Sequence, residues 1–131
     1  MTLAFPKQKK KRKKTSLNKE LDTLWSKAVK VDGKCEYCGR ESGLNAHHYF
    51  SRSIIPLRWN LDNGFCLCAG CHTLSSKMSA HKTPAEFCDW AREIRGLKWE
   101  ADLRAIKNEN YRLTDDDKKK IKETLENALT S

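Results

Sequence analysis

The chain has 131 residues, of which 33% are charged, and its six cysteines are many for its length. No apolar run approaches the roughly 18 residues that a membrane span needs, and the first 15 residues lack the apolar region of a secretory signal. A membrane protein and a secreted disulfide scaffold are therefore both disfavoured. We expect one small α+β domain in the cytoplasm, where reduced cysteines bind metal.

The net charge of +9 is concentrated at the N-terminus. Residues 1–19 contain eight Lys and Arg and no acid, whereas the remainder is nearly balanced. A run of like charges cannot pack, so we predict that residues 1–15 form a disordered arm that contacts DNA phosphates by counterion release. A solubilising or targeting tail is the alternative. The cations expected to contact DNA are Lys9, Lys10, Lys11, Arg12, Lys13 and Lys14.

A helix is predicted after this arm. Apolar residues recur there at helical spacing and stop before Asp32-Gly33, which is typical of a helix that packs one face on the domain. The repeating positions are Leu17, Leu21, Leu24, Trp25, Ala28 and Val29.

Two Cys-x-x-Cys pairs follow, Cys35 with Cys38 and Cys68 with Cys71. Four thiolates in two close pairs are the ligand set of a tetrahedral structural zinc ion. A set of buried thiols without metal is the alternative. The 29 residues between the pairs exceed the usual spacing of a zinc ribbon, which an inserted functional unit would explain.

Polar residues that a structural zinc does not need lie within or beside this interval: His47, His48, Asn63 and His72. We predict a strand over 44–50, a loop over 51–60, a second strand over 63–67 and a helix that begins at Ala69 or His72. This order is a ββα unit with a cysteine pair at each end. Neighbouring strand residues point to opposite faces, so His47 and His48 can share a site only where the strand ends or bends.

These motifs resemble a known family over residues 33–82. Asn63 lies 15 residues after His48, and His72 lies 24 residues after His48. Both spacings are similar to those of HNH endonucleases of the ββα-metal superfamily, in the subclass with a four-cysteine zinc. The segment that begins at His81 and Lys82 further resembles phage recombination nucleases of the NinG/Rap kind. The matched pattern is Cys35-x-x-Cys38, Ala46-His47-His48, Leu61-Asp62-Asn63 and Leu67-Cys68-x-x-Cys71-His72.

The resemblance implies a role for each of these side chains. His48 would be the general base, and His47 and His72 would bind a catalytic divalent cation (Mg²⁺, Mn²⁺, Ni²⁺ or Zn²⁺) beside the structural Zn²⁺. Asn63 would bridge the loop and orient the base, although in some relatives it binds the metal. Many members have a third histidine four residues after the last, where this chain has Ser76, so two histidines with water and phosphate are expected to bind the ion.

Four further cations near these motifs are candidate phosphate contacts, although a solvated surface charge is the commoner outcome for any one of them: Arg40, Arg52, Arg58 and Lys77.

The last part of the chain is predicted to be helical. Thr83-Pro84-Ala85-Glu86 is typical of a capping box at a helix start, and Gly96 of a helix end. A second helix carries Trp99, Leu103 and Ile106, and Thr114 with the three aspartates after it caps a third. We therefore expect a ββα-metal core within residues 16–82, which include the preceding helix, and about three helices over 83–131 packed on it.

The predicted function is a metal-dependent DNA endonuclease with little sequence specificity, in a bacterial or phage-infected cell and acting on DNA rather than at a membrane. Two alternatives stay open. In the first, the chain is a zinc-stabilised DNA-binding module without catalysis. In the second, it is an interaction subunit of a phage or repair complex. Whether it is a monomer or a homodimer is also open.

Overall fold

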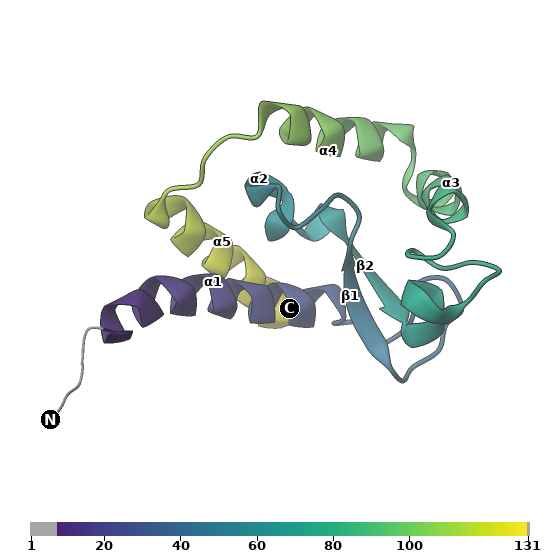
Figure 1. Ribbon diagram of the computed structural model, residues 1–131, viewed down its shortest axis with the longest axis horizontal. Coiled ribbons are helices and arrows are strands. Elements are labelled where there is room, and N and C mark those ends of the chain that lie inside the picture. The colour runs from purple at the N-terminus through teal and green to yellow at the C-terminus, as the bar shows by residue number, and fades with distance from the viewer. Residues whose placement is uncertain (1–7, 131) are drawn as a thin grey trace, which may run out of the picture.

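The computed structural model describes residues 8–130, with side chains from Leu17 onward. Helices dominate this range and enclose a two-stranded sheet, which confirms the predicted α+β class (Figure 1). None of the helices described is long and apolar enough to cross a bilayer. The elements are α1 (Gln8–Val29), β1 (Leu44–His48), α2 (Ile55–Arg58), a 3₁₀ turn (Leu61–Asn63), β2 (Gly64–Cys68), a π-helical turn (Gly70–Leu74), α3 (Pro84–Arg95), α4 (Leu97–Glu109) and α5 (Asp115–Thr130).

β1 and β2 pair in antiparallel register, with Leu44 opposite Cys68 and His48 opposite Gly64. Both strands fall within one or two residues of their predicted positions. Every residue of β2 is buried, whereas β1 is half-buried along its length. A Cβ atom at Gly64 would lie 2.5 Å from Val29 Cγ2, so glycine lets α1 approach the end of the sheet closely.

Two apolar clusters make up the core. One lies between β2 and α3 and contains Phe65, Leu67, Phe87 and the buried cysteines of the Cys-x-x-Cys pairs. The other lies between α1 and α5 and contains Leu21, Trp25, Ala28, Trp59 and Leu125. The Leu/Trp stripe predicted for the first helix is therefore core, as expected from its spacing.

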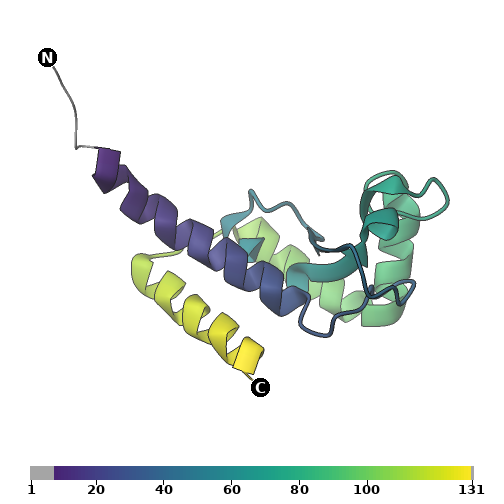
Figure 2. The ribbon, with the colours of Figure 1, turned by 90° about the horizontal axis from the view of Figure 1, so that it is seen from below.

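α5 lies along α1, and Figure 2 shows the two helices side by side. Lys122 of α5 also pairs with Glu20 of α1, at 3.1 Å. The N-terminus of α5 is capped as predicted, because Thr114 Oγ1 accepts from Asp117 N at 3.1 Å and Asp117 Oδ2 accepts from Thr114 N at 2.9 Å.

α3 begins at Pro84 and ends at Gly96, which has φ 95° and separates it from α4. The predicted capping box at Thr83 is wrong, since this side chain makes no bond to the first turn of α3. Thr83 Oγ1 instead accepts from Ser79 N at 2.8 Å and donates to Ser79 O at 3.0 Å. The hydroxyl closes the preceding loop because its own backbone lies beside that of Ser79.

The structure also differs from the prediction at the start of the chain. α1 begins at Gln8, so residues 8–15 are helical rather than disordered, while the rest of the predicted arm, residues 1–7, lies outside the described residues. Lysine and arginine are good helix formers, and they extend a helix that residues 17–29 already anchor by packing.

The helix predicted after β2 is only one turn long, Gly70–Leu74. The next residues form a loop in which hydroxyl groups bond the backbone: Ser75 Oγ accepts from Met78 N at 3.2 Å, and Ser79 Oγ donates to Ser75 O at 2.8 Å. Serine side chains compete with helical hydrogen bonds in this way, which ends the helix early.

Candidate active site and metal centres

The four cysteines of the Cys-x-x-Cys pairs form one cluster, in which the sulfur atoms all lie within 4.8 Å of one another. Cys38 Sγ and Cys68 Sγ are 3.6 Å apart, and all four thiols are free. A tetrahedral zinc with bonds of about 2.3 Å separates its sulfur ligands by about 3.8 Å. The cluster can therefore hold a structural metal, and the predicted grouping of the four cysteines is confirmed.

Tight local turns bring these sulfurs together. Cys35 N donates to Arg40 O at 2.8 Å and Gly39, at φ 80°, closes the first knuckle, while Cys71 N points at Cys68 Sγ from 3.5 Å. Burial acts to raise the pKa of the Cys35 thiol, but the backbone N–H groups directed at it outweigh burial and lower that pKa to about 7. Cys35 thus favours the thiolate, the form that binds metal, whereas burial raises the pKa of the Cys71 thiol.

A second cluster is made of three histidines, His47 from β1, His72 from the π-helical turn and His81 from the loop before α3. Their ring nitrogens can all lie within 4.8 Å of one another, and His72 Nε2 is 3.1 Å from His81 Nε2. Two imidazole ligands at about 2.1 Å from one ion are separated by about 3.0–3.4 Å. The spacing fits a divalent metal, and His81 is exposed, which leaves one side of the cluster open.

Two histidines of this cluster favour their neutral, metal-binding form. Burial, together with smaller contributions from His72 and His81, lowers the pKa of His47 to about 3. The pKa of His72 is lowered too, first by burial and then by His81. Neutral imidazole is the ligand form, and imidazole suits Mn²⁺, Co²⁺, Ni²⁺ or Zn²⁺ better than Mg²⁺.

His81 was missed from the sequence, and it changes the expected ligand set from two histidines to three. Backbone hydrogen bonds hold His81 beside the other two histidines. Ala80 N donates to Cys71 O at 2.9 Å, and His81 N donates to His72 O at 3.0 Å. Ser76, at the position expected from the family, is exposed and lies outside the cluster. The sequence analysis included His81 in the segment that resembles phage recombination nucleases but gave it no metal-binding role, because a pattern of helical spacing after His72 does not select it.

His48 lies apart from this cluster, as the alternation of a strand requires. Its ring stacks on Trp25 of α1, with centroids 3.9 Å apart and planes at 11°. His48 Nε2 is 2.9 Å from the carbonyl oxygen of Arg58. A carbonyl only accepts, so Nε2 carries the proton and Nδ1 is left with a free lone pair. Burial lowers the pKa of His48, which favours this neutral form.

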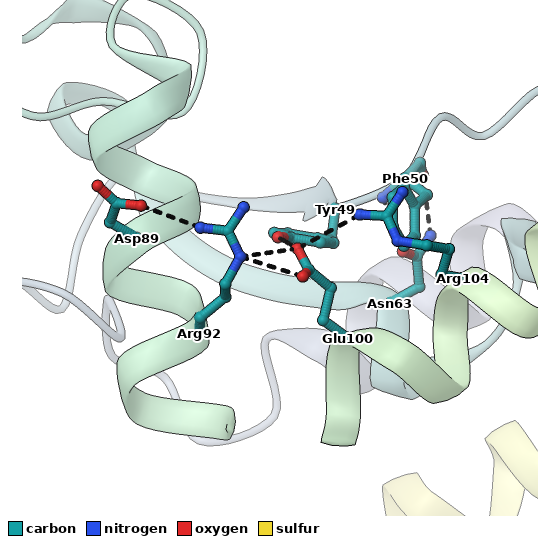
Figure 3. Close-up of polar contacts among 7 residues, drawn as sticks. All are labelled: Tyr49, Phe50, Asn63, Asp89, Arg92, Glu100 and Arg104. Carbon is teal, nitrogen blue, oxygen red and sulfur yellow. Dashed lines mark hydrogen bonds and ion pairs between the residues drawn. The ribbon is translucent and has the colours of Figure 1, made fainter. Parts of the chain in front are cut away.

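Asn63 is fully buried and holds the loop between the strands. Its Nδ2 donates to Phe50 O at 2.9 Å, and its Oδ1 accepts from Phe50 N at 2.8 Å (Figure 3). Asn63 Nδ2 also donates to Leu57 O at 3.2 Å. The amide therefore lies outside the histidine cluster and bridges the loop, next to the Arg58 carbonyl that His48 contacts. Of its two expected roles, the geometry fits bridging rather than metal binding.

The predicted phosphate contacts divide into two pairs. Arg52 and Arg58 both bind the carboxylate of Asp22, at 3.2 and 2.7 Å. Arg40 and Lys77 line one hollow of about 560 Å³ beside the cysteine cluster. For Lys9, Lys10, Lys11, Arg12, Lys13 and Lys14 the structure describes the backbone within α1 but not the side chains.

A network of polar side chains connects β1 to the C-terminal helices. Tyr49 donates to Glu100 of α4, which also accepts from Arg92 Nε of α3 at 3.0 Å, and Arg104 lies 3.8 Å away (Figure 3). The Tyr49 hydroxyl, followed by the Arg92 guanidinium, keeps the pKa of Glu100 below its usual value. This network attaches α3 and α4 to the strand that carries the two histidines, and nothing in the sequence pattern indicated it.

No protein-family model, curated protein or solved structure matches this chain.

Proposed function

We propose that this protein is a metal-dependent endonuclease of the HNH kind, which hydrolyses phosphodiester bonds in DNA. The observation that carries the proposal is the pair of neighbouring histidines at the end of β1. His47 belongs to a three-histidine cluster, while His48 keeps a free Nδ1 lone pair on the other face. A cation site and a general base are the two groups that metal-assisted phosphodiester hydrolysis uses, and here they come from adjacent residues at the end of β1.

His48 takes the part of general base in this proposal. Its Nδ1 removes a proton from water, the water oxygen forms a bond to phosphorus, and the bond from phosphorus to the 3′ oxygen breaks. The electron pair of that bond leaves on the 3′ oxygen, which takes a proton from solvent, and His48 returns its own proton to solvent. The products carry 5′-phosphate and 3′-hydroxyl ends.

His47, His72 and His81 would hold the divalent cation. When bound, this ion would stabilise negative charge on the phosphate and on the leaving oxygen. The residues themselves contribute a partly buried set of nitrogens, which is neutral at His47 and His72 and open at His81.

The cysteine cluster supports the active site in this proposal by holding a structural zinc. Cys71 directly precedes His72, and its carbonyl accepts from the residue before His81. A zinc on the four sulfurs would therefore fix both ends of the backbone that carries two of the three histidines.

The proposed substrate is DNA recognised by its backbone. The N-terminal run of lysine and arginine can contact phosphates of any sequence, and the described residues contain no helix-turn-helix or other base-reading module. Low sequence specificity follows from these two features.

Nicking of supercoiled plasmid tests the proposal. Protein with its zinc retained is supplied with Mg²⁺, Mn²⁺, Ni²⁺ or Co²⁺ in turn, and His48→Ala is run beside Asn45→Ala, a control on the same strand. We expect metal-dependent nicking that His48→Ala lowers about 100- to 10,000-fold and Asn45→Ala preserves. If the folded protein binds DNA and zinc but nicks with none of these ions, the proposal is wrong and the protein is a DNA-binding module without catalysis.

A further inference from the structure

Asp22, in the middle of α1, is the acceptor for three side chains of the loop that follows β1. Its carboxylate accepts from Arg58 Nε at 3.0 Å and Nη2 at 2.7 Å, from Trp59 Nε1 at 2.8 Å and from Arg52 Nη2 at 3.2 Å. Burial acts to raise the pKa of Asp22, but the donors of Arg58 and Trp59 outweigh it and keep that pKa below the usual value. The carboxylate is thus ionised whenever the protein is near neutral pH.

The two arginines that bind this carboxylate differ in how many of their N–H donors remain available to a ligand. Arg58 uses Nε and Nη2 together, its side chain is only 18% exposed, and its own carbonyl accepts from His48. Arg52 makes a single contact at 3.2 Å and is 59% exposed. Since a guanidinium has five N–H donors, Arg52 keeps most of them for a ligand, whereas Arg58 serves the architecture of the loop.

Asp22 also places Arg52 close to the proposed base. Asp22 and Trp25 are three residues apart in α1, which puts them on the same face about one turn apart. Arg52 binds the first of these residues and His48 stacks on the second. Trp25 Nε1 also donates to Asn60 O at 2.9 Å, so α1 is attached to the loop at both positions.

We propose that Asp22 is a positioning residue that holds Arg52 beside His48, where the free guanidinium donors contact the phosphate group that is cleaved. This inference rests on the proposed nuclease function. A guanidinium matches two phosphate oxygens with parallel hydrogen bonds, and a carboxylate that already orients it lowers the conformational entropy lost on binding. Arg52 would then supply charge at the phosphate from the side opposite to the histidine cluster.

The test compares single-turnover cleavage by Arg52→Ala, Arg52→Lys, Arg58→Ala and Asp22→Asn at saturating protein. The best metal for the wild type is used, and DNA affinity is measured in parallel. We expect Arg52→Ala to slow cleavage about 100-fold while DNA affinity changes less than about threefold, because the other cations still bind the DNA backbone. Arg52→Lys should recover part of the rate. Asp22→Asn should slow cleavage about tenfold.

Added guanidinium ion at low millimolar concentration separates direct contact from a structural role. It should restore part of the rate of Arg52→Ala but none of the rate of Arg58→Ala or Asp22→Asn, where the loop itself is altered. Lys98→Ala, which removes a cation of α4 that is 88% exposed and pairs with Asp102 rather than with Asp22, is the control and should cleave like the wild type.

The outcomes separate this inference from the proposed function. Wild-type cleavage with an unimpaired Arg52→Ala, or a slow Arg52→Ala that guanidinium does not rescue, overturns the assignment of Arg52 and leaves the nuclease intact. No cleavage by the wild type with any of the ions overturns both.

Discussion

His81 Nε2 lies 3.1 Å from His72 Nε2, although the two histidines are nine positions apart along the chain. The approach is made by the backbone, since His81 N donates to His72 O. His72 and His81 are therefore two points of one hydrogen-bonded loop. That loop begins at Cys71, the last cysteine of the other cluster. This arrangement connects the cysteine cluster and the histidine cluster in a single segment.

Removal of His81 should weaken binding of the second metal. With zinc retained on the cysteines, His81→Ala is expected to lower Ni²⁺ affinity at least about tenfold, or ~1.4 kcal/mol, because a ligand is removed. Isothermal titration calorimetry measures this directly. Ser76→Ala, at the position expected from the family pattern, is the control and should bind Ni²⁺ like the wild type. Equal affinity in both variants would show that the cluster binds metal through His47 and His72 alone.

Loss of a cysteine ligand should unfold the core. Cys68→Ser removes one of four sulfurs within 4.8 Å, and we expect loss of bound zinc together with loss of the cooperative thermal transition, since binding free energy of structural zinc is folding free energy. Zinc content and circular dichroism report the two effects. Cys66→Ala, two residues earlier on the same strand and outside the cluster, should keep its zinc. A folded Cys68→Ser protein without zinc would contradict the structural role.

The packing of α5 on α1 should matter for stability. Leu125 is 1% exposed and lies in the cluster with Leu21 and Trp25, so Leu125→Ala is expected to cost about 2–5 kcal/mol of unfolding free energy. Urea denaturation of the zinc-loaded protein measures the change. Leu97→Ala, at a leucine that is 72% exposed, should change stability by less than about 0.5 kcal/mol. Equal effects of both changes would mean that α5 does not pack on α1 in solution.

The cations at the start of α1 should determine the salt dependence of DNA binding. Replacement of Lys9, Lys10, Lys11, Arg12, Lys13 and Lys14 by glutamine keeps the chain length and removes the charge. For each phosphate that the variant no longer neutralises, the slope of log affinity against log salt should fall in magnitude by about 0.9. Fluorescence anisotropy at several salt concentrations gives the slope. An unchanged slope would assign DNA binding to other parts of the protein.

Local patterns were sufficient for much of the fold. The apolar stripe of residues 17–29, the strands that flank the loop, the helix end at Gly96 and the cap at Thr114 were all predicted, because each depends on residues within a few positions of one another. The capping box at Thr83 was wrong for a related reason. The sequence shows the right residue types, but the hydroxyl has a nearer partner in Ser79 once the loop has folded back.

The candidate site was predictable only in part. The cysteine cluster and the loop-bridging contacts of Asn63 agree with what the motifs implied, since these residues flank two paired strands. His81 and Asp22 were not found. Each contacts the site through a long-range approach, His81 through backbone pairing with His72 and Asp22 through side chains 30 or more residues away along the chain.

By itself the sequence determined the class of the fold, the grouping of the four cysteines and the pair of histidines, because residue type and short spacing decide which groups can bind metal or form a helix. Only the tertiary structure decided which histidine joins His47 and His72, which arginine stays exposed, and which helix supports His48. These depend on where the backbone of the 75–83 loop and the face of α1 meet the sheet. The positions of these segments against the sheet depend on burial and hydrogen bonding across the whole domain, which no short segment encodes.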